Sequence, residues 1–279
     1  MKQNIGLVDR LFQYRVLELY EAITDFVMSR GDRIRVGLLY LGLIKKAKIN
    51  TKDGNIVVNS LREYRIAFDR YYKKKVNIAF LIKIARMEYG WLNVRNKKVV
   101  DIGANVGDTA IYFAKEGAIH VYAYEPYPFL FNKARKNVRN SGYSTKITLN
   151  NAAVLDREGT LRIREDYKAD GGTDLKKFET GKLIQLITLS SIITKTNISN
   201  GVLKLDCEGS EYQILLRAKI SDLRKFDQIA LEYHYGYLNL KNKLEEAGFQ
   251  VRNTRPRKVY NTQATNPYMK VGLMFAKRL

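Results

Sequence analysis

The pattern of apolar positions changes along the chain. Before residue 98 it is mostly helical, and from residue 98 onward it predicts strands that alternate with helices. Apolar side chains recur three and four positions apart in the first part, which is typical of amphipathic helices. A polar turn, Lys52-Asp-Gly-Asn55, separates two short apolar runs and predicts a hairpin. The expected helices cover residues 7–29, 60–72 and 76–89, and the hairpin covers 47–58. Residues 1–97 are therefore predicted to form a helical and hairpin extension.

From residue 98 onward, short apolar runs alternate with amphipathic segments. Strands are predicted at 99–102, 118–124, 146–150, 202–206, 228–233, 249–253 and 270–276. Helices are predicted up to Glu116 and over 128–140, 210–217 and 238–247. This alternation is typical of a parallel sheet with helices on both faces, so residues 98–279 form the predicted α/β domain. The last two strands are joined by about 15 residues with no helical pattern, which predicts that they are antiparallel neighbours.

Composition limits the class of protein. Hydrophobic residues make up 46% of the chain, enough for a sizeable core. The longest apolar run near the start, residues 36–44, is far shorter than the roughly 20 residues that span a membrane. No signal peptide is evident, and Cys207 is the only cysteine, which excludes an internal disulfide and a cysteine metal cage. We therefore expect a cytoplasmic protein.

The formal net charge is +21, and residues 1–98 hold 21 Lys and Arg against 9 Asp and Glu, which gives +12. A surface of this charge suits nucleic acid, anionic lipid or an acidic substrate. A solvated, highly charged surface is the simpler interpretation, because the basic residues are scattered rather than gathered in one run. Contact with a membrane surface through the N-terminal helix stays open.

The pattern Asp101-x-Gly103-x-x-x-Gly107 lies where a strand turns into a helix, and Glu125 ends the next strand 22 residues beyond Gly103. Glycines allow the backbone to turn sharply and to pass close to a ligand. A carboxylate at the end of the second strand can accept hydrogen bonds from both hydroxyls of a ribose. The pattern therefore predicts a site for a cofactor that contains a nucleoside.

Two details favour S-adenosylmethionine over a dinucleotide. The tightly spaced G-x-G-x-x-G pattern that holds a pyrophosphate is missing, since Ala104 and Asn105 follow Gly103. Asp101 would repel a pyrophosphate, whereas it suits a cofactor with a cationic amino group and a sulfonium. The alternative is an ordinary tight turn between a strand and a helix.

Four segments together resemble the FkbM family of S-adenosylmethionine-dependent methyltransferases. They are DIGANVGDT from Asp101, the strand end Tyr124-Glu125-Pro126, Asn151-Ala-Ala-Val154, and LKLDCEGSE from Leu203. The resemblance covers roughly residue 54 to the end and implies a Rossmann-like class I methyltransferase fold. This fold has a seven-stranded, mostly parallel sheet with one antiparallel strand. The resemblance also implies methyl transfer, usually to a hydroxyl of a sugar, glycolipid or secondary metabolite.

The same resemblance assigns a cofactor role to residues at four strand ends. The loop around the methionine part of the cofactor contains Asp101, Gly103, Ala104, Asn105 and Gly107. Glu125, followed by Pro126, is expected to bind the ribose, and Asn151 and Ala152 the adenine. Asp206 is expected beside the amino acid part and the reacting methyl group.

A hydroxyl acceptor must lose its proton, so a nearby base helps the reaction. The candidates at the carboxyl edge of the sheet are Asp206, Glu208, Glu211, Glu232 and His234. Of these, Asp206, Glu208 and His234 are the predicted catalytic residues, and no bound metal is predicted. Three alternatives stay open: acidic side chains that only favour a helix N-terminus, a histidine that only packs, and carboxylates that hold a divalent metal.

We therefore expect an O-methyltransferase that acts on a small molecule or glycan. The alternative is an RNA ribose methyltransferase that uses the basic residues 1–98 to track phosphates. Asp-Cys-Glu-Gly after the fourth strand replaces the Asn/Asp-Pro-Pro-aromatic motif of enzymes that methylate base amines, which argues against that reaction. A binding protein with a degenerate site is disfavoured by the intact loop and Glu125.

Overall fold

The computed structural model describes residues 38, 47–51, 54–58, 78–163, 179–260 and 268–278. The chain divides into two compact units, residues 1–77 and residues 78–279. The helices predicted over 7–29 and 60–72 lie outside the described residues. No helix in the described part is long and apolar enough to span a membrane.

The described part of the first unit contains the predicted hairpin. Strand β1 (Ala47–Thr51) pairs antiparallel with β2 (Gly54–Val58), with Ala47 opposite Val58 and Thr51 opposite Gly54. Both strands lie within the predicted range 47–58.

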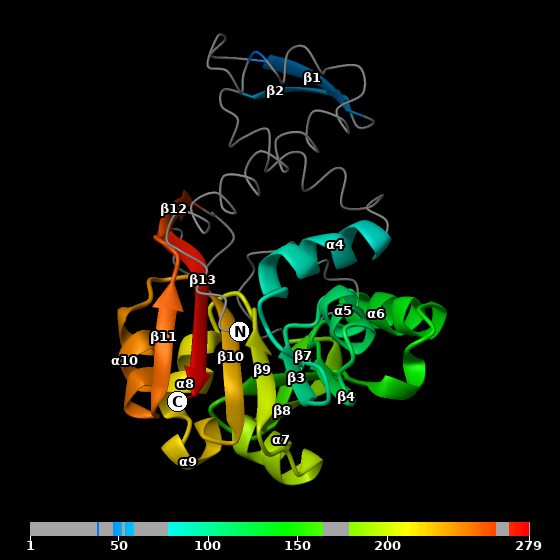
Figure 1. Cartoon of the computed structure of the whole chain (residues 1–279). Helices are drawn as coiled ribbons and strands as arrows, with labels where there is room; N and C mark the ends of the chain where they lie inside the picture. The colour runs from blue at the N-terminus through cyan, green and yellow to red at the C-terminus, as the bar shows by residue number, and fades with distance from the viewer. Residues whose placement is uncertain are drawn as a thin grey trace. The chain divides into compact units, whose positions relative to one another are not determined.

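The second unit is built on one twisted sheet (Figure 1). Its strands are β3 (Lys98–Ile102), β4 (His120–Tyr124), β5 (Ile147–Asn150), β9 (Gly201–Leu205), β10 (Phe226–Tyr233), β11 (Phe249–Asn253) and β13 (Tyr268–Arg278). They run in the order β11-β13-β10-β9-β3-β4-β5, and β12 (Arg257–Tyr260) pairs with β13 beyond this path. Only β13 in this path is antiparallel to its neighbours. The predicted seven-stranded sheet with one antiparallel strand is confirmed.

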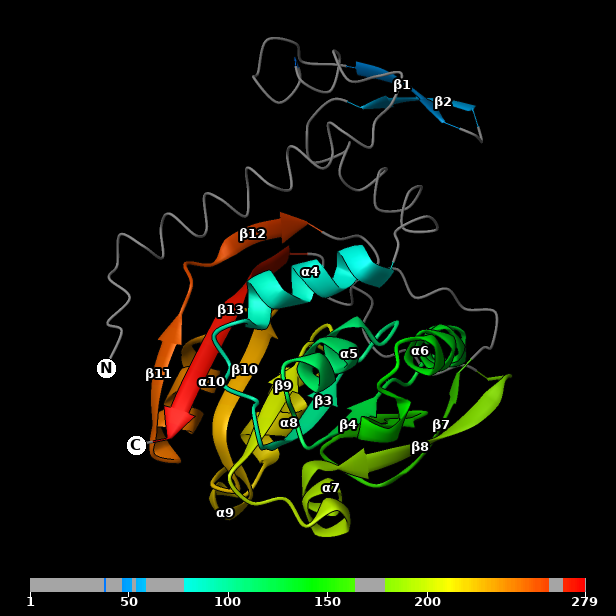
Figure 2. The ribbon, with the colours of Figure 1, turned by 45° about the vertical axis from the view of Figure 1, so that its right-hand side comes forward.

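Helices cover both faces of the sheet (Figure 2). They are α4 (Ile78–Tyr89), α5 (Asp108–Lys115), α6 (Pro128–Asn140), α7 (Leu189–Thr196), α8 (Glu211–Arg217), α9 (Ile220–Leu223) and α10 (Leu238–Glu246), with a short 3₁₀ turn at Ser144–Lys146. Helix α6 has the predicted bounds, because Pro128 stands at its first turn, where a missing N–H costs nothing.

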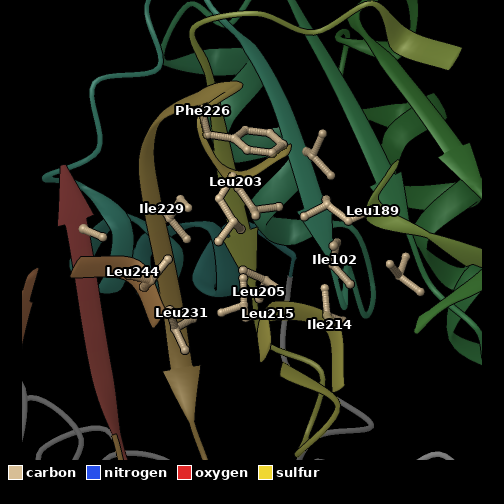
Figure 3. Packing of buried hydrophobic residues seen from close by; sticks show 14 of the residues in the cluster. Ile102, Leu189, Leu203, Leu205, Ile214, Leu215, Phe226, Ile229, Leu231 and Leu244 are labelled. Carbon is tan, nitrogen blue, oxygen red and sulfur yellow. The ribbon is translucent and has the colours of Figure 1, made fainter. Parts of the chain in front are cut away.

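The strands are apolar on both faces because each face is buried. Val99 and Val202 point toward the layer that contains α4 and α5. Leu203, Leu205 and Ile229 point to the opposite layer, where α7, α8 and α10 pack (Figure 3). Complete burial of a leucine stabilises a fold by roughly 1.5–3 kcal/mol, so this layer contributes strongly to keeping β9 and β10 in place.

Helix α4 belongs to the second unit. Ala85 and Tyr89 are 1% exposed and pack in the same core cluster as Val99 of β3 and Phe113 of α5. The structure thus groups residues 78–97 with the sheet, whereas the sequence pattern grouped them with the N-terminal extension.

A second, smaller sheet lies between β5 and β9 in the sequence and was not predicted. It consists of β6 (Ala152–Leu155), β8 (Lys182–Thr188) and β7 (Gly159–Ile163), in the order β6-β8-β7. Strand β6 is parallel to β8, and β7 is antiparallel to it. The helices α7 and α9 and the short strand β12 were also not predicted. These elements are short, and a few apolar residues in a row do not show a period.

Candidate functional site

The loop between β3 and α5 passes against the end of β9. Gly103 has a φ of +79°, and a Cβ atom added there would lie 1.8 Å from the carbonyl oxygen of Asp206. Only glycine fits so close to another backbone. Gly107 precedes α5 with a φ of 85°, and Asn105 between them has a φ of 48°. The predicted glycine pattern therefore forms a sharp turn at the carboxyl end of β3.

Glu125 stands at the end of β4 and joins this loop to the start of α6. Its Oε2 accepts a hydrogen bond from the backbone N–H of Asn105 at 2.8 Å, and its Oε1 accepts one from Tyr127 N–H at 2.9 Å. Burial raises the pKa of Glu125 to about 8, although the two amides lower it. Each carboxylate oxygen keeps a second lone pair, so the group can accept further hydrogen bonds from a ligand.

Asn151, between β5 and β6, lies beside Glu125 and offers an unused acceptor. Its Nδ2 donates to the carbonyl oxygens of Glu125 and Pro126, both at 2.9 Å. Its Oδ1 is buried and has no hydrogen-bond partner among the described residues. A buried acceptor without a partner costs about 1–3 kcal/mol, so a donor from a ligand or water would be favoured at this point. Ala152, the next residue, begins β6 and is buried.

Asp101 is paired with a buried lysine on the neighbouring strand. Nζ of Lys204 lies 3.1 Å from Oδ1 of Asp101, and the two side chains are 1% and 0% exposed. Thr109 donates to Oδ2 of Asp101 at 2.6 Å. Lys204 also donates to the carbonyl oxygen of Gly103 at 2.8 Å. Burial lowers the pKa of Lys204, but the carboxylates of Asp101 and Asp206 outweigh this effect, so the ammonium stays charged.

This pair changes the interpretation of Asp101. The sequence suggested that its carboxylate would meet the cationic amino group of a cofactor, whereas in the structure its cation is Lys204. Asp101 therefore supports the glycine loop from inside the sheet. Lys204 was missed, although a lysine within the apolar run of Gly201–Leu205 was a visible signal for a buried charge.

Acidic side chains gather around His234 at the carboxyl ends of β9 and β10. His234 Nε2 lies 3.1 Å from Glu208 Oε2 and 3.9 Å from Glu232 Oε2. On the other side of the ring, Nδ1 lies 3.3 Å from Glu211 Oε1. Ligand atoms of Asp206, Glu232 and His234 lie within 4.8 Å of one another. All the base candidates taken from the sequence are therefore in one cluster.

The charges in this cluster favour a carboxylate over His234 as a proton acceptor. Burial lowers the pKa of His234, but Glu211 and Glu208 raise it well above the ordinary value. An imidazole that keeps its proton at neutral pH has no free lone pair for another. Burial raises the pKa of Asp206 and of Glu232, so these carboxylates hold a proton more readily than an ordinary carboxylate does.

The two groups of residues meet at the loop 103–107. Asn105 contacts Glu125, and Gly103 contacts Asp206, so the loop has one group of residues on each side. The strand order reverses between β3 and β9, and open α/β sheets bind ligands at the carboxyl edge of such a reversal. The structure thus brings the predicted residues to the edge where a ligand is expected.

Residues 101–251 match the family described as the methyltransferase FkbM domain. A search of curated proteins gives no match.

Three solved structures illustrate the general likeness of fold. Precorrin-6y C5,15-methyltransferase from Geobacter metallireducens is 14% identical, with 72% of this chain and 87% of that chain covered and a TM-score of 0.38. A ribosomal protein L11 methylase from Lactobacillus delbrueckii is 16% identical, with 72% of this chain and 79% of that chain covered and a TM-score of 0.39. An rRNA methylase from Streptococcus thermophilus is 12% identical, with 72% of this chain and 93% of that chain covered and a TM-score of 0.41.

We expect the Lys204 and Asp101 side chains to be energetically coupled. Lys204→Met leaves the Asp101 carboxylate buried without its cation, so the free energy of unfolding should fall by about 3–5 kcal/mol. Asp101→Asn should also destabilise the protein, and the double variant should lose clearly less than the sum of the two single losses. Urea denaturation of the four proteins measures this coupling. Strictly additive losses would contradict a direct interaction.

We expect a pH dependence of stability from Glu125. Its pKa is about 8 in the folded chain against an ordinary value of 4.5. A carboxyl group with a raised folded-state pKa stabilises the fold fully below pH 4.5, and this contribution is lost as the pH rises through about 8. Relative to Glu125→Gln, which does not titrate, the wild-type free energy of unfolding should therefore fall between these two pH values.

Denaturant unfolding between pH 4 and 9 measures this difference for both proteins, and Glu246→Gln on the exposed end of α10 is the matched control. The amide that replaces the Glu125 carboxylate can shift the whole curve but adds no slope. A wild-type minus Glu125→Gln difference that stays constant with pH would rule out the raised pKa.

Proposed function

The chain belongs to the FkbM methyltransferase family, and we propose that it transfers a methyl group from S-adenosylmethionine to a hydroxyl of a sugar, glycolipid or other small molecule. One observation carries this proposal. The glycine loop at 103–107 has the Glu125 carboxylate on one side and the carboxylates around His234 on the other. The first side suits a nucleoside donor, and the second suits an acceptor that must lose a proton.

The residues present fit the donor at three points. The lone pairs that Glu125 keeps can accept hydrogen bonds from two ribose hydroxyls. The buried Oδ1 of Asn151 can accept a hydrogen bond from the adenine amino group. The sharp turn at Gly103 lets the backbone approach the methionine part closely. When bound, S-adenosylmethionine supplies an electrophilic methyl group on a sulfonium.

The role of the protein in methyl transfer is mainly to align the acceptor oxygen and to receive its proton. Alignment at near-attack distance removes much of the entropic barrier. Asp206 lies beside Gly103 and in the same cluster as Glu232, so it stands between the donor side and the acceptor side. A carboxylate of this cluster would accept the proton of the hydroxyl as the new carbon–oxygen bond forms.

The carboxylates favour a small neutral acceptor over RNA. Asp206, Glu208 and Glu232 would repel the phosphates of a nucleic acid that approached the reacting methyl group. The net charge of +12 over residues 1–98 is the observation that favours RNA ribose methylation as the second candidate.

We expect S-adenosylhomocysteine, but not NAD, to raise the melting temperature. At a ligand concentration 100 times the Kd, binding adds about 2.7 kcal/mol to the stability of the folded state. Glu125→Ala removes two hydrogen bonds to the ribose worth about 0.5–1.5 kcal/mol each, so the Kd should rise roughly 5- to 150-fold. Differential scanning fluorimetry over a ligand titration measures both effects.

Each variant is compared with its own melting temperature without ligand, because Glu125 also joins the loop at 103–107 to the start of α6. Glu246→Ala, an exposed glutamate on α10, is the control and should respond like the wild type. Stabilisation by NAD, or by neither ligand, would overturn the donor assignment and the proposed function with it.

We expect methyl transfer to a glycan or small-molecule hydroxyl rather than to RNA. Full-length protein is incubated with labelled S-adenosylmethionine and either a panel of mono- and oligosaccharides or total RNA. The product should be a methyl ether that survives mild alkali, because an ether is not hydrolysed as an ester is. Mass spectrometry of the acceptor and release of S-adenosylhomocysteine measure the reaction.

The RNA arm separates the two candidate functions. Salt-sensitive labelling of RNA that yields 2′-O-methyl nucleosides on digestion would favour the second candidate and contradict the first. Labelling of glycans that does not depend on salt would support the first.

A further inference from the structure

The cluster at the ends of β9 and β10 has the composition and spacing of a metal site. It contains two carboxylates and one imidazole whose ligand atoms lie within 4.8 Å of one another. We propose that Asp206, Glu232 and His234 bind a divalent metal ion that holds the acceptor hydroxyl. The binding of the ion stands on these residues alone, and only its role in the reaction rests on the proposed function.

The imidazole of His234 is held with one nitrogen toward the cluster. His234 is 2% exposed, and its Nδ1 has no aligned hydrogen bond among the described residues. Nδ1 faces Glu211 Oε1 at 3.3 Å, so a small rotation of the ring would complete a hydrogen bond. This leaves Nε2 directed at the other carboxylates, and an ion that binds there would displace the proton that Nε2 shares with Glu208 in the ion-free chain. Histidines that bind metals are oriented in this way by a carboxylate on the far nitrogen.

Glu211 is itself fixed, which makes it a positioning residue. Its Oε1 accepts a hydrogen bond from Cys207 N–H at 2.7 Å, and its Oε2 accepts one from Gly209 N–H at 2.9 Å. The side chain is 0% exposed. A buried carboxylate held by two amides can orient His234 but cannot itself reach the ion.

The distances are close to those of a coordination sphere, in which two ligands at about 2.1 Å from one ion lie no more than about 4.2 Å apart. Two ligands at about 2.1 Å from an ion and at right angles to each other lie about 3.0 Å apart. Nε2 of His234 lies 3.1 Å from Glu208 Oε2 and 3.9 Å from Glu232 Oε2. Glu208 is thus near enough to serve as a fourth ligand or to hold a water on the ion.

The negative charge of the cluster would also favour the binding of a cation. Four carboxylates, those of Asp206, Glu208, Glu211 and Glu232, surround one imidazole. The buried ammonium of Lys204 is already in contact with Asp101. A divalent ion would offset the mutual repulsion of the carboxylates. Because the side chains of Glu208 and Glu232 are 28% and 26% exposed, an ion can enter from solvent.

The ligand types indicate which ions fit. A nitrogen ligand together with carboxylate oxygens favours Mn²⁺, Fe²⁺ or Zn²⁺ over Ca²⁺ and Mg²⁺, which prefer oxygen alone. Such an ion would hold the acceptor hydroxyl and make its proton more acidic. The oxygen lone pair then forms the carbon–oxygen bond, the carbon–sulfur electron pair stays on sulfur, and the hydroxyl proton passes to a carboxylate. This inference departs from the prediction of a metal-free site.

The test is a titration of the chelator-treated full chain with Mn²⁺, followed through the EPR signal of the free ion. We expect one ion for each chain. Asp206→Asn and Glu232→Gln keep the side-chain shape but remove a ligand charge, and each should weaken binding by more than about 100-fold. Glu211→Gln, which acts through His234, should weaken it by about 10- to 100-fold. Glu246→Gln on α10 is the control and should leave binding unchanged.

Circular dichroism of each variant shows whether it is folded. Asp206 follows β9 and Glu232 lies on β10, so one misfolded variant does not end the test. Failure of the wild type to bind Mn²⁺, Fe²⁺ or Zn²⁺ stoichiometrically would overturn the proposal. Binding that is as tight in Asp206→Asn and Glu232→Gln as in the wild type would also overturn it.

The same proteins separate this inference from the proposed function. S-adenosylhomocysteine should still stabilise Glu232→Gln, because Glu232 lies on β10 and is not one of the residues expected to hold the donor. Metal binding without any response to S-adenosylhomocysteine would keep the metal site and overturn the donor assignment. A response to S-adenosylhomocysteine without metal binding would keep the donor assignment and overturn the metal site.

Discussion

The ammonium of Lys204 lies between two central strands, where it is tolerated only because Asp101 stands directly opposite it in the register of β3 and β9. Removing two charges from water costs several kcal/mol for each ion, so the pair must keep a close geometry. Because the same ammonium donates to the carbonyl oxygen of Gly103, this requirement extends to the start of the loop. The register of the central strands and the position of the glycine turn are therefore set by one buried contact.

The sheet extends from these two strands in both directions, and a different group of polar residues lies on each side. Strands β4 and β5 lead to Glu125 and Asn151, which suit a nucleoside. Strands β9 and β10 lead to the carboxylates around His234. The first group comes from a continuous stretch of sequence, residues 101–151, whereas the second is drawn from two strands and a helix. The residues of the first group can thus be kept while those of the second group change.

The sequence predicted what depends on neighbouring residues and missed what depends on distant ones. The bounds of α6 follow from Pro128 and a helical period, and the strands from β3 to β5 follow from short apolar runs. The sharp turn at 103–107 and the position of Glu125 at the end of β4 also follow from local spacing. The partner of Asp101 was not found, because Lys204 lies more than 100 residues away and a lysine in an apolar run carries no sign of its partner. The contact of Nδ1 of His234 with Glu211 was missed for the same reason.

The position of β13 has a consequence for how the sheet is completed. It lies between β10 and β11 and pairs with both, although β11 precedes it in the sequence. During synthesis β11 and the helix α10 before it emerge first, but β11 has no strand to pair with until residues 268–278 have been made. The edge of β10 is left unpaired for the same interval, and an unpaired apolar edge is prone to association with other chains. The pairing of β10, β13 and β11 is thus a late step of folding. Until it is complete, the exposed edge of β10 is the surface that a chaperone would cover.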